Sequence, residues 1–591
     1  MQERPTGVSG SGAHLAAIPR LRLLLCLLTA AAVFVFGQAP TTAVIAPPTP
    51  LNTNAATDSG DDIFPYVASD GAGNWVTVWQ SDDSLGGPIG TDSDILIARS
   101  TDNGATWAAP APLYTNAGAN TGNDEAPRVA TDRADNWVAV WQSTDTVGGT
   151  IGTDWDVLTA YSSDNGATWS TPIPLNTNAA TDGGDDVAPQ VATNATGNWV
   201  AVWQSTDPLG GTIGADEDIL VSRSTDNGAT WTAPAFLNAY AAVDPLTSQD
   251  TVPQIATDGA GNWVTIWQST ATLGTGVGTD EDILVARSTS NGVFWTSPAA
   301  VNSNAPGDDL PDVSPQLATA GGRWVAVWQS FDSLGGTIGL DSDILTAQST
   351  DNGASWTSAA PLNGNAATDS GNDGDPHLAT NGFGHWAAVW PSTDDLGGII
   401  FIDPDVLVSR STDDAGTWDL PVPLNTNAAT DTESDSSPTI AAGVGTWVAV
   451  WRSFESLGGT IGTDADVLFT TLDANCGPPD FDGDGWGDAC DSCPMVATAW
   501  FVPPGDADCD GFTTSDETVI ATNPAVACDD EVGPPDWPPD FNDDKAVNIL
   551  DVFQMFPVWF GVSQRQDLNL DGVVNILDVF LMFDYWLETC T

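Results

Sequence analysis

The sequence predicts a mainly β protein whose larger part is a set of seven repeated units, followed by a tail of different composition. Three observations support this prediction. A strand-like phrase recurs seven times, from NWVTVWQS at Asn74 to TWVAVWRS at Thr446. An eight-residue phrase, STDNGATW at Ser100, recurs between those copies. Six of the seven cysteines lie beyond residue 475, where the repeats stop.

The strand-like phrase has a nearly constant period. The spacings between the first tryptophans of successive copies are 62, 62, 64, 61, 62 and 61 residues. These tryptophans are Trp75, Trp137, Trp199, Trp263, Trp324, Trp386 and Trp447. Such a period indicates a repeat architecture in which each unit packs on its neighbours.

Each unit contains four segments that we expect to be extended, called A to D. Examples are PQVATN at Pro189 for A, WVAVW at Trp199 for B, DILVARS at Asp282 for C and PLN at Pro174 for D. Segment B is apolar on both alternating faces, so both faces should be covered. Four-stranded sheets stacked around an axis satisfy this, and the sequence therefore predicts a seven-bladed β-propeller over residues 49–473.

The two ends of the repeat region complement each other. The region opens at Thr49 with a D segment that has no A, B or C of its own. The last unit has A at Pro438, B at Trp447 and C near Asp466, and then stops. We therefore expect the N-terminal strand to complete the last blade, which closes the ring and leaves no open edge between first and last blades.

The eight-residue phrase, S-x-D-x-G-x-x-W, resembles the Asp box of the sialidase-like (BNR-repeat) propellers. That resemblance implies a structural hairpin turn between segments C and D, in which the Asp accepts bonds from turn N–H groups and the Trp packs into the blade. Ser290 replaces the Asp in the fourth copy, and STDDAGTW shifts the glycine in the sixth. The copies are Ser100–Trp107, Ser162–Trp169, Ser224–Trp231, Ser288–Trp295, Ser349–Trp356 and Ser411–Trp418.

The resemblance implies a fold but no catalytic residues, because fold and active site are separate properties. Catalytic sialidases use three arginines, one of them in an Arg-Ile-Pro motif, and this sequence has no Arg-Ile-Pro. Catalytic residues are therefore left unknown. The residue after the A-segment proline differs between blades beside the expected channel mouth, which favours ligand contact there, with ordinary drift as the alternative. These seven residues are Tyr66, Arg128, Gln190, Gln254, Gln316, His377 and Thr439.

The same face is expected to carry three aspartates in each blade. One stands three residues before the A-segment proline: Asp62, Asp124, Asp186, Asp250, Asp312, Asp373 and Asp435. A D-x-D pair ends each B-to-C loop: Asp92/Asp94, Asp154/Asp156, Asp216/Asp218, Asp280/Asp282, Asp341/Asp343, Asp403/Asp405 and Asp464/Asp466. Three interpretations stay open: the carboxylates cap local turns, they bind calcium, or they meet a basic protein partner.

Charge and the N-terminus bear on partners and location. A net charge of −66 argues against nucleic acid and anionic membrane surfaces as partners and favours cations. Arg20 and Arg22 precede a short apolar run over residues 23–37. This pattern predicts a signal peptide over residues 1–39 and an extracellular, secreted protein with no transmembrane segment after cleavage. An uncleaved membrane anchor is the alternative.

The tail begins with two predicted calcium loops in residues 476–530. DFDGDGWGDACDSCP resembles a thrombospondin type 3 repeat, and GDADCDGFTTSDE fits the EF-hand register with its closing acid at position twelve. The predicted metal ligands are Asp480, Asp482, Asp484, Asp488 and Asp491, then Asp506, Asp508, Asp510, Thr514 and Glu517.

A Pro-rich linker over residues 531–539 leads to two matching segments over 540–591, which resemble the paired loop–helix repeats of type I dockerin. The resemblance implies an α-helical domain and these calcium ligands: Asp540, Asn542, Asp544, Asn548 and Asp551, then Asp567, Asn569, Asp571, Asn575 and Asp578. Lys545 replaces the turn glycine of the first loop. Calcium is the expected cofactor, and a cohesin-like module or cell-surface scaffold is the implied partner.

Two functions compete at this point. The first is a secreted, calcium-binding recognition protein whose propeller binds a glycan or a protein and whose tail attaches it to a surface or scaffold. The second is a secreted glycoside hydrolase, sialidase-like or other, that acts in polysaccharide degradation. Carboxyl pairs converging on a pocket with aromatics would favour the enzyme, whereas carboxylates clustered within each blade would favour metal binding.

Overall fold

The computed structural model describes residues 45–473, apart from 88, 91, 115–120, 243–247, 273–276, 279, 303, 306, 308–309 and 402. The predicted signal peptide (1–39), the calcium loops (476–530), the linker (531–539), the dockerin-like domain (540–591) and their metal ligands lie outside these residues. Within the described ranges, no helix is long and apolar enough to cross a membrane.

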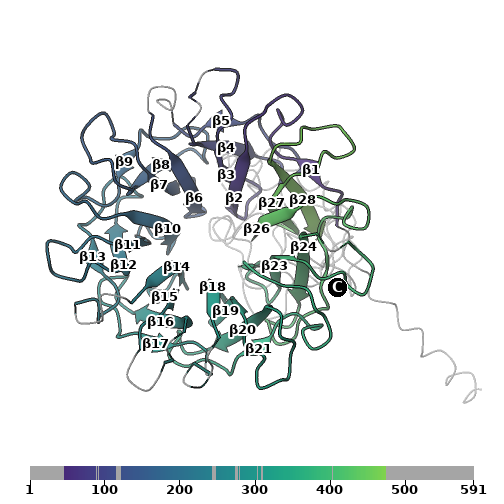
Figure 1. Ribbon diagram of the computed structural model, residues 1–591. Coiled ribbons are helices and arrows are strands. Elements are labelled where there is room, and N and C mark those ends of the chain that lie inside the picture. The colour runs from purple at the N-terminus through teal and green to yellow at the C-terminus, as the bar shows by residue number, and fades with distance from the viewer. Residues whose placement is uncertain are drawn as a thin grey trace, which may run out of the picture. The chain divides into compact units, whose positions relative to one another are not determined.

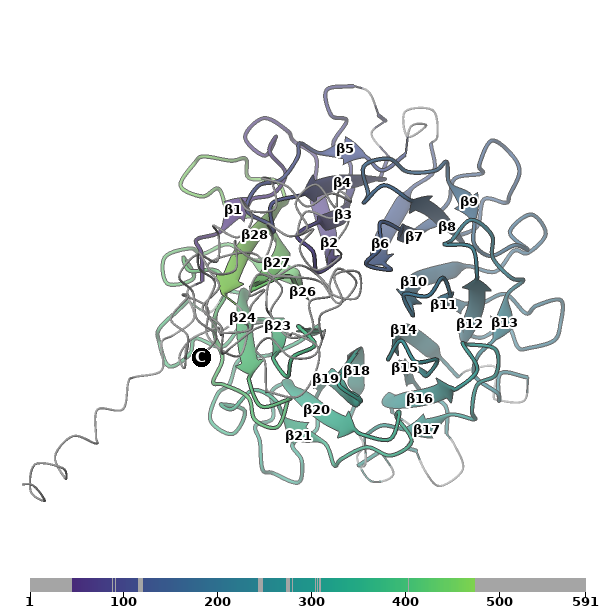
Figure 2. The same ribbon diagram turned by 180° about the vertical axis from the view of Figure 1, so that it is seen from behind.

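Seven four-stranded antiparallel sheets are arranged as blades around a central axis (Figures 1 and 2), which confirms the predicted seven-bladed β-propeller. Blades 1 to 3 consist of β2 (Asp62–Ser69), β3 (Trp75–Ser81), β4 (Asp94–Ser100) and β5 (Ala111–Pro112); β6 (Asp124–Thr131), β7 (Trp137–Ser143), β8 (Asp156–Ser162) and β9 (Ile173–Pro174); and β10 (Asp186–Thr193), β11 (Trp199–Ser205), β12 (Asp218–Ser224) and β13 (Ala235–Phe236).

The remaining blades repeat this order from the axis outwards. They consist of β14 (Asp250–Thr257), β15 (Trp263–Ser269), β16 (Asp282–Ser288) and β17 (Ala299–Ala300); β18 (Asp312–Ala320), β19 (Arg323–Ser330), β20 (Asp343–Ser349) and β21 (Ala360–Pro361); β22 (His377–Thr380), β23 (Trp386–Ser392), β24 (Asp405–Ser411) and β25 (Val422–Pro423); and β26 (Asp435–Ala442), β27 (Thr446–Ser453) and β28 (Asp466–Asp473), with β1 (Thr49–Pro50) as the outer strand.

The second strand of each blade forms the core. All seven residues of β3 are buried, because blades cover this strand on both faces, as its apolar sequence predicted. The two tryptophans of the strand, Trp75 and Trp79, are fully buried, and their equivalents in the other blades are buried as well. Burying a large aromatic side chain contributes roughly 1.5–3 kcal/mol, so these pairs supply much of the stability of the ring.

The last blade is completed by the start of the propeller sequence, as expected. β1 pairs antiparallel with β28, with Thr49 opposite Phe469 and Pro50 opposite Leu468. The Leu51 N–H then donates to the carbonyl of Val467 at 2.8 Å. In Figure 1 the purple strand β1 lies beside the green strand β28. The ring is thus closed by hydrogen bonds between the two ends of the repeat region.

The recurring eight-residue phrase forms the turn between the third and fourth strands, as the Asp-box resemblance implied. In blade 3, Asp226 accepts hydrogen bonds from the backbone N–H of Thr230 at 2.9 Å and from its hydroxyl at 2.6 Å. Gly228 has a φ of 83°, and a Cβ there would lie 2.6 Å from Cγ2 of Val138 in the preceding blade. The box therefore both folds its own turn and packs the blade against its neighbour.

Candidate functional site

A strained bulge interrupts the inner strand of the blades close to the axis. In blade 1 the pairing between β2 and β3 shifts register between Ile63 and Tyr66, and Phe64 in the gap has a φ of 51°. The equivalent residues of the other blades also have positive φ: Ala126, Ala188, Val252, Ser314, Asp375 and Ser437. Such backbone costs about 1–3 kcal/mol per non-glycine residue and concentrates at functional sites.

Side chains of the preceding blade hold several of these bulges in place. The Ala188 N–H donates to Oε1 of Gln142 at 3.0 Å, and the Ser314 N–H donates to Oε1 of Gln268 at 2.9 Å. A bulge changes the direction in which the following side chains point. Here the proline and the residue after it are directed to a pocket on the axis.

This axial pocket has a volume of about 250 Å³ and is lined by residues from all seven blades. It contains all seven residues that the sequence predicted for ligand contact: Tyr66, Arg128, Gln190, Gln254, Gln316, His377 and Thr439. The sequence could place them together because they follow the same proline in every repeat. Their role in binding a ligand stays a prediction.

Arg128 gives the axial pocket a positive charge that forms no ion pair with the described residues. Its guanidinium carbon lies 5.1 Å from the centroid of the Tyr66 ring. Its Nη1 donates to the carbonyl of Pro127 at 2.8 Å, while its buried Nε has no hydrogen-bond partner. Among the described residues the single ion pair is Arg323 with Asp414, so no carboxylate lies within ion-pair distance of Arg128.

His377 is a neutral member of the same pocket. Its ring meets Tyr66 edge-on with centroids 5.5 Å apart, and its Nδ1 accepts a hydrogen bond from the Ile440 N–H at 3.2 Å. Burial, together with the charge of Arg128, lowers the pKa of His377 to about 3. Nε2 therefore carries the ring hydrogen at neutral pH and can donate to a ligand.

The pocket lining includes one acidic residue among the residues that the structure describes, Asp375. Its Oδ1 accepts a hydrogen bond from the Ser314 hydroxyl at 2.7 Å. No pair of carboxyl groups converges on the described lining.

The aspartate at the start of each inner strand is part of the blade interior. Asp62 is fully buried, with Oδ1 accepting from the Trp79 indole N–H at 2.9 Å and Oδ2 from the Asn52 amide at 2.7 Å. The same Asn52 amide also donates to Oδ1 of Asp466 at 2.7 Å. Indole and amide donors thus occupy both oxygens of Asp62, which favours a structural role for this residue. Calcium binding by the aspartates that precede the inner strands stays a prediction.

The amide that bridges two carboxylates recurs around the ring, and we call it the asparagine clip. Each clip joins the aspartate three residues before the inner-strand proline to the first residue of the third strand in the preceding blade. The clips, each with its two carboxylates, are Asn52 (Asp466, Asp62), Asn176 (Asp156, Asp186), Asn238 (Asp218, Asp250), Asn302 (Asp282, Asp312) and Asn363 (Asp343, Asp373).

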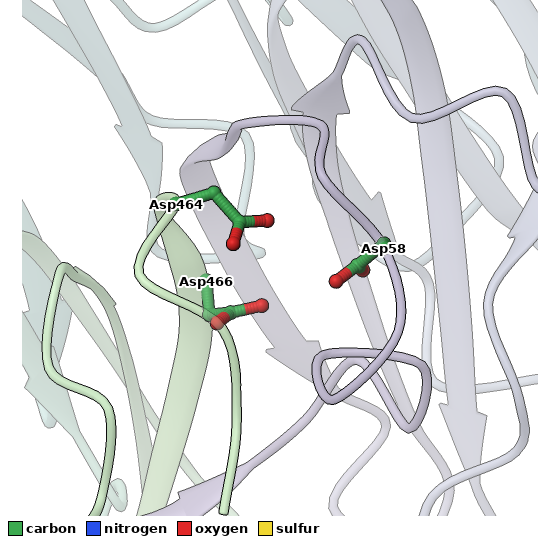
Figure 3. Close-up of side chains that lie close together, drawn as sticks. All are labelled: Asp58, Asp464 and Asp466. Atoms are coloured by element: carbon green, nitrogen blue, oxygen red, sulfur yellow. The ribbon is translucent and has the colours of Figure 1, made fainter. Parts of the chain in front are cut away.

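The D-x-D pairs meet a different aspartate, which sequence reasoning missed. In four places a D-x-D pair and an aspartate from the loop that leads to the next blade bring carboxylate oxygens within 4.8 Å of one another. Figure 3 shows one such set, with its three carboxylates directed toward a shared space. We call these sets the carboxylate clusters: Asp58/Asp464/Asp466, Asp154/Asp156/Asp182, Asp341/Asp343/Asp369 and Asp403/Asp405/Asp431.

A repeated phrase in the sequence contained the missing member. NAATD ends at Asp58, Asp182, Asp369 and Asp431, the four loop residues of the clusters. The corresponding loop positions of the other three blades lie outside the described residues.

Proximity and burial make these carboxyl groups costly to ionise together. Burial, followed by the charges of Asp58 and Asp464, raises the pKa of Asp466 to about 7. Burial and the charges of Asp464 and Asp83 raise the pKa of Asp58 to about 6. The carboxyl groups of a cluster therefore retain protons at higher pH than ordinary aspartates unless a cation neutralises them.

Comparisons with solved structures find distant similarities. The chain is similar to the Hadza microbial sialidase Hz136 (14% identity, 67% of this chain and 73% of that chain, TM-score 0.38). It is also similar to the leech intramolecular trans-sialidase (12%, 73% and 70%, TM-score 0.35) and to the NanB sialidase of Streptococcus pneumoniae (10%, 73% and 71%, TM-score 0.36). No family model and no curated protein matches the chain. Because these sequence identities and TM-scores are low, the function must be inferred from the chain's own residues.

Proposed function

We propose that the propeller is a recognition module that binds a small anionic group in the axial pocket. The observation that carries this proposal is Arg128, a partly enclosed cation with an unpartnered Nε and no carboxylate within ion-pair distance. A guanidinium in such surroundings favours a planar anion that can accept two parallel hydrogen bonds, such as a carboxylate.

The chemistry around Arg128 favours an acidic sugar at the end of a glycan. Tyr66 presents an aromatic surface, and the amides of Gln190, Gln254 and Gln316 can both donate to and accept from hydroxyl groups. A volume of about 250 Å³ is smaller than the roughly 300–1,000 Å³ of common ligand pockets, so the pocket suits one terminal residue rather than a chain.

The glycoside hydrolase remains the alternative function. Hydrolysis of a glycosidic bond usually requires two carboxyl groups facing each other across the bond. The described pocket lining contains Asp375 alone, and the other carboxylates gather between the blades. These two observations favour recognition over hydrolysis.

A glycan array, run with the full chain, tests both functions. We expect the wild-type protein to bind glycans that end in a carboxylated sugar, and Arg128→Ala to lose at least about 10-fold in affinity, the loss of one charge-assisted contact of about 1.5 kcal/mol. Arg133→Ala, at an exposed arginine in the same blade, is the matched control and should bind normally. Equal binding by Arg128→Ala would contradict the proposal, and turnover of a fluorogenic glycoside would establish the hydrolase.

We further propose that the tail, loaded with calcium, attaches the exported propeller to a cohesin-like module or cell-surface scaffold. This proposal rests on the four loop spacings between residues 480 and 578 and on the leader over residues 1–39. The double variant Asp567→Ala/Asp571→Ala should abolish calcium-dependent binding of the full chain to a type I cohesin. Binding that persists in chelator would refute the dockerin assignment, and a mature N-terminus upstream of residue 30 would refute the predicted cleavage.

A further inference from the structure

The carboxylate clusters have buried oxygens that no hydrogen bond satisfies. Asp466 is fully buried, and its Oδ1 accepts from Asn52 while its Oδ2 has no partner. The other two members of this cluster each have one such oxygen, Oδ1 of Asp58 and Oδ2 of Asp464. In Figure 3 all three carboxylates are directed toward the same space. An unsatisfied buried acceptor costs about 1–3 kcal/mol, and more when charged, so the arrangement needs a compensating ligand.

The same set of buried oxygens without donors occurs in all four clusters, so it belongs to the repeated structure of the blades. In each cluster the unpartnered atoms are Oδ1 of the loop aspartate and Oδ2 of both D-x-D aspartates. Asp156, Asp343 and Asp405 are at most 1% exposed and therefore correspond to Asp466. The unpartnered oxygens are those of Asp154/Asp156/Asp182, Asp341/Asp343/Asp369 and Asp403/Asp405/Asp431.

Turn capping does not account for these oxygens. A capping aspartate accepts hydrogen bonds from nearby backbone N–H groups. In blade 4, where the structure describes no cluster, Asp282 does accept from the Gly278 N–H at 3.2 Å. In the four clusters, by contrast, Asp466, Asp156 and Asp343 accept from the asparagine clips and Asp405 accepts from the Asn425 amide, while Oδ2 of each has no donor.

The surroundings suit a divalent cation with hard oxygen ligands. Each cluster offers three carboxylate oxygens within 4.8 Å of one another, and Ca²⁺ takes oxygens at 2.3–2.6 Å, so that two ligands of one ion lie up to about 5 Å apart. A further oxygen is at hand, because Asn54 donates through Nδ2 to Asp58 at 2.7 Å and its buried Oδ1 has no partner. Asn178, Asn365 and Asn427 have the same arrangement.

We propose that each of the four carboxylate clusters binds one Ca²⁺ ion between its D-x-D pair and the loop that crosses to the next blade. At the cluster of Asp58, Asp464 and Asp466, the ion connects the loop after β1 to the start of β28. It therefore joins the N-terminal closing segment to the last blade. These sites are separate from the axial pocket and from the predicted calcium loops of the tail.

Calcium stoichiometry in the full chain tests the proposal, because the tail loops contribute equally to every variant. Equilibrium dialysis against Ca²⁺ alone should give a stoichiometry four lower for the quadruple variant Asp58→Asn/Asp182→Asn/Asp369→Asn/Asp431→Asn than for the wild type. The single variant Asp58→Asn should weaken one site by about 100-fold, since affinity follows the number of charged ligands. Asp419→Asn, at an exposed carboxylate outside the clusters, should leave the stoichiometry unchanged.

Thermal unfolding gives a second test, because the difference in melting temperature between the quadruple variant and the wild type should depend on whether calcium is present. Without cation, in chelator, the quadruple variant should melt no lower than the wild type, because the substitutions remove like charges that repel one another. In calcium it should melt lower, because it cannot gain the ligand's stabilisation. An unchanged stoichiometry, or an undiminished calcium shift of the propeller transition in the quadruple variant, would overturn the proposal. Equal affinity for Mg²⁺ would overturn the assignment to calcium.

Discussion

The asparagine clip of blade 2 gives the sharpest prediction about what holds the blades together. Asn176 is fully buried and donates through Nδ2 to Asp156 at 2.7 Å and to Asp186 at 2.6 Å, while its Oδ1 accepts from the Val157 N–H at 3.1 Å. Asn176→Ala removes all three bonds. At about 1 kcal/mol for each of the three hydrogen bonds, we expect a loss of about 3 kcal/mol.

Equilibrium urea unfolding followed by tryptophan fluorescence measures this loss, because the core tryptophans report directly on the blades. The matched control is Asn198→Ala, in the turn between β10 and β11 of blade 3. Its amide makes one long contact of 3.4 Å to the Thr196 hydroxyl, and the expected loss is below about 0.5 kcal/mol. If Asn176→Ala cost no more than Asn198→Ala, the clip would not be a major link between the blades.

Two further predictions concern the Asp box and the axial pocket. Gly228→Ala should destabilise the propeller by about 2–4 kcal/mol, because the φ of Gly228 is 83° and the new Cβ would lie 2.6 Å from Val138. Ala415→Gly, at a φ of 62°, should instead stabilise the propeller by about 0.5 kcal/mol. If urea unfolding showed that both variants change stability in the same direction, this reasoning would be contradicted. His377 has its pKa lowered from 6.5 to about 3, so between these values the unfolded state binds more protons and stability falls as the pH falls. The wild type should therefore lose about 2 kcal/mol between pH 7 and pH 5 that His377→Asn does not lose, and parallel pH profiles of the two proteins would refute the low pKa.

The sequence predicted the propeller well because its information is periodic. The number of blades, the closing strand and the seven residues around the axis all follow from positions that recur every 61–64 residues. The same register places Tyr66 and Arg128 on one ring around the axis.

The sequence did not reveal which carboxylates meet. Asp62 and Asp58 are four residues apart and both recur in the repeats, yet Asp62 accepts a hydrogen bond from Trp79 and Asp58 faces Asp464. Their different surroundings depend on the conformation of the loop between the blades, and the period of the repeat does not predict that conformation. The bulge at Phe64 was likewise unexpected, because positive φ at a non-glycine residue has no reliable sequence signal.

The closure of the ring by β1 and β28 has a consequence for how the chain reaches its native state. The two strands that must pair are the first and the last of the propeller sequence, so the entropic cost of a very long loop falls on the final step. Until that step, the edge of β28 is open, and the β1 of a second copy fits it as well as its own. Refolding at high protein concentration should therefore favour exchanged dimers, in which each molecule lends its first strand to the other.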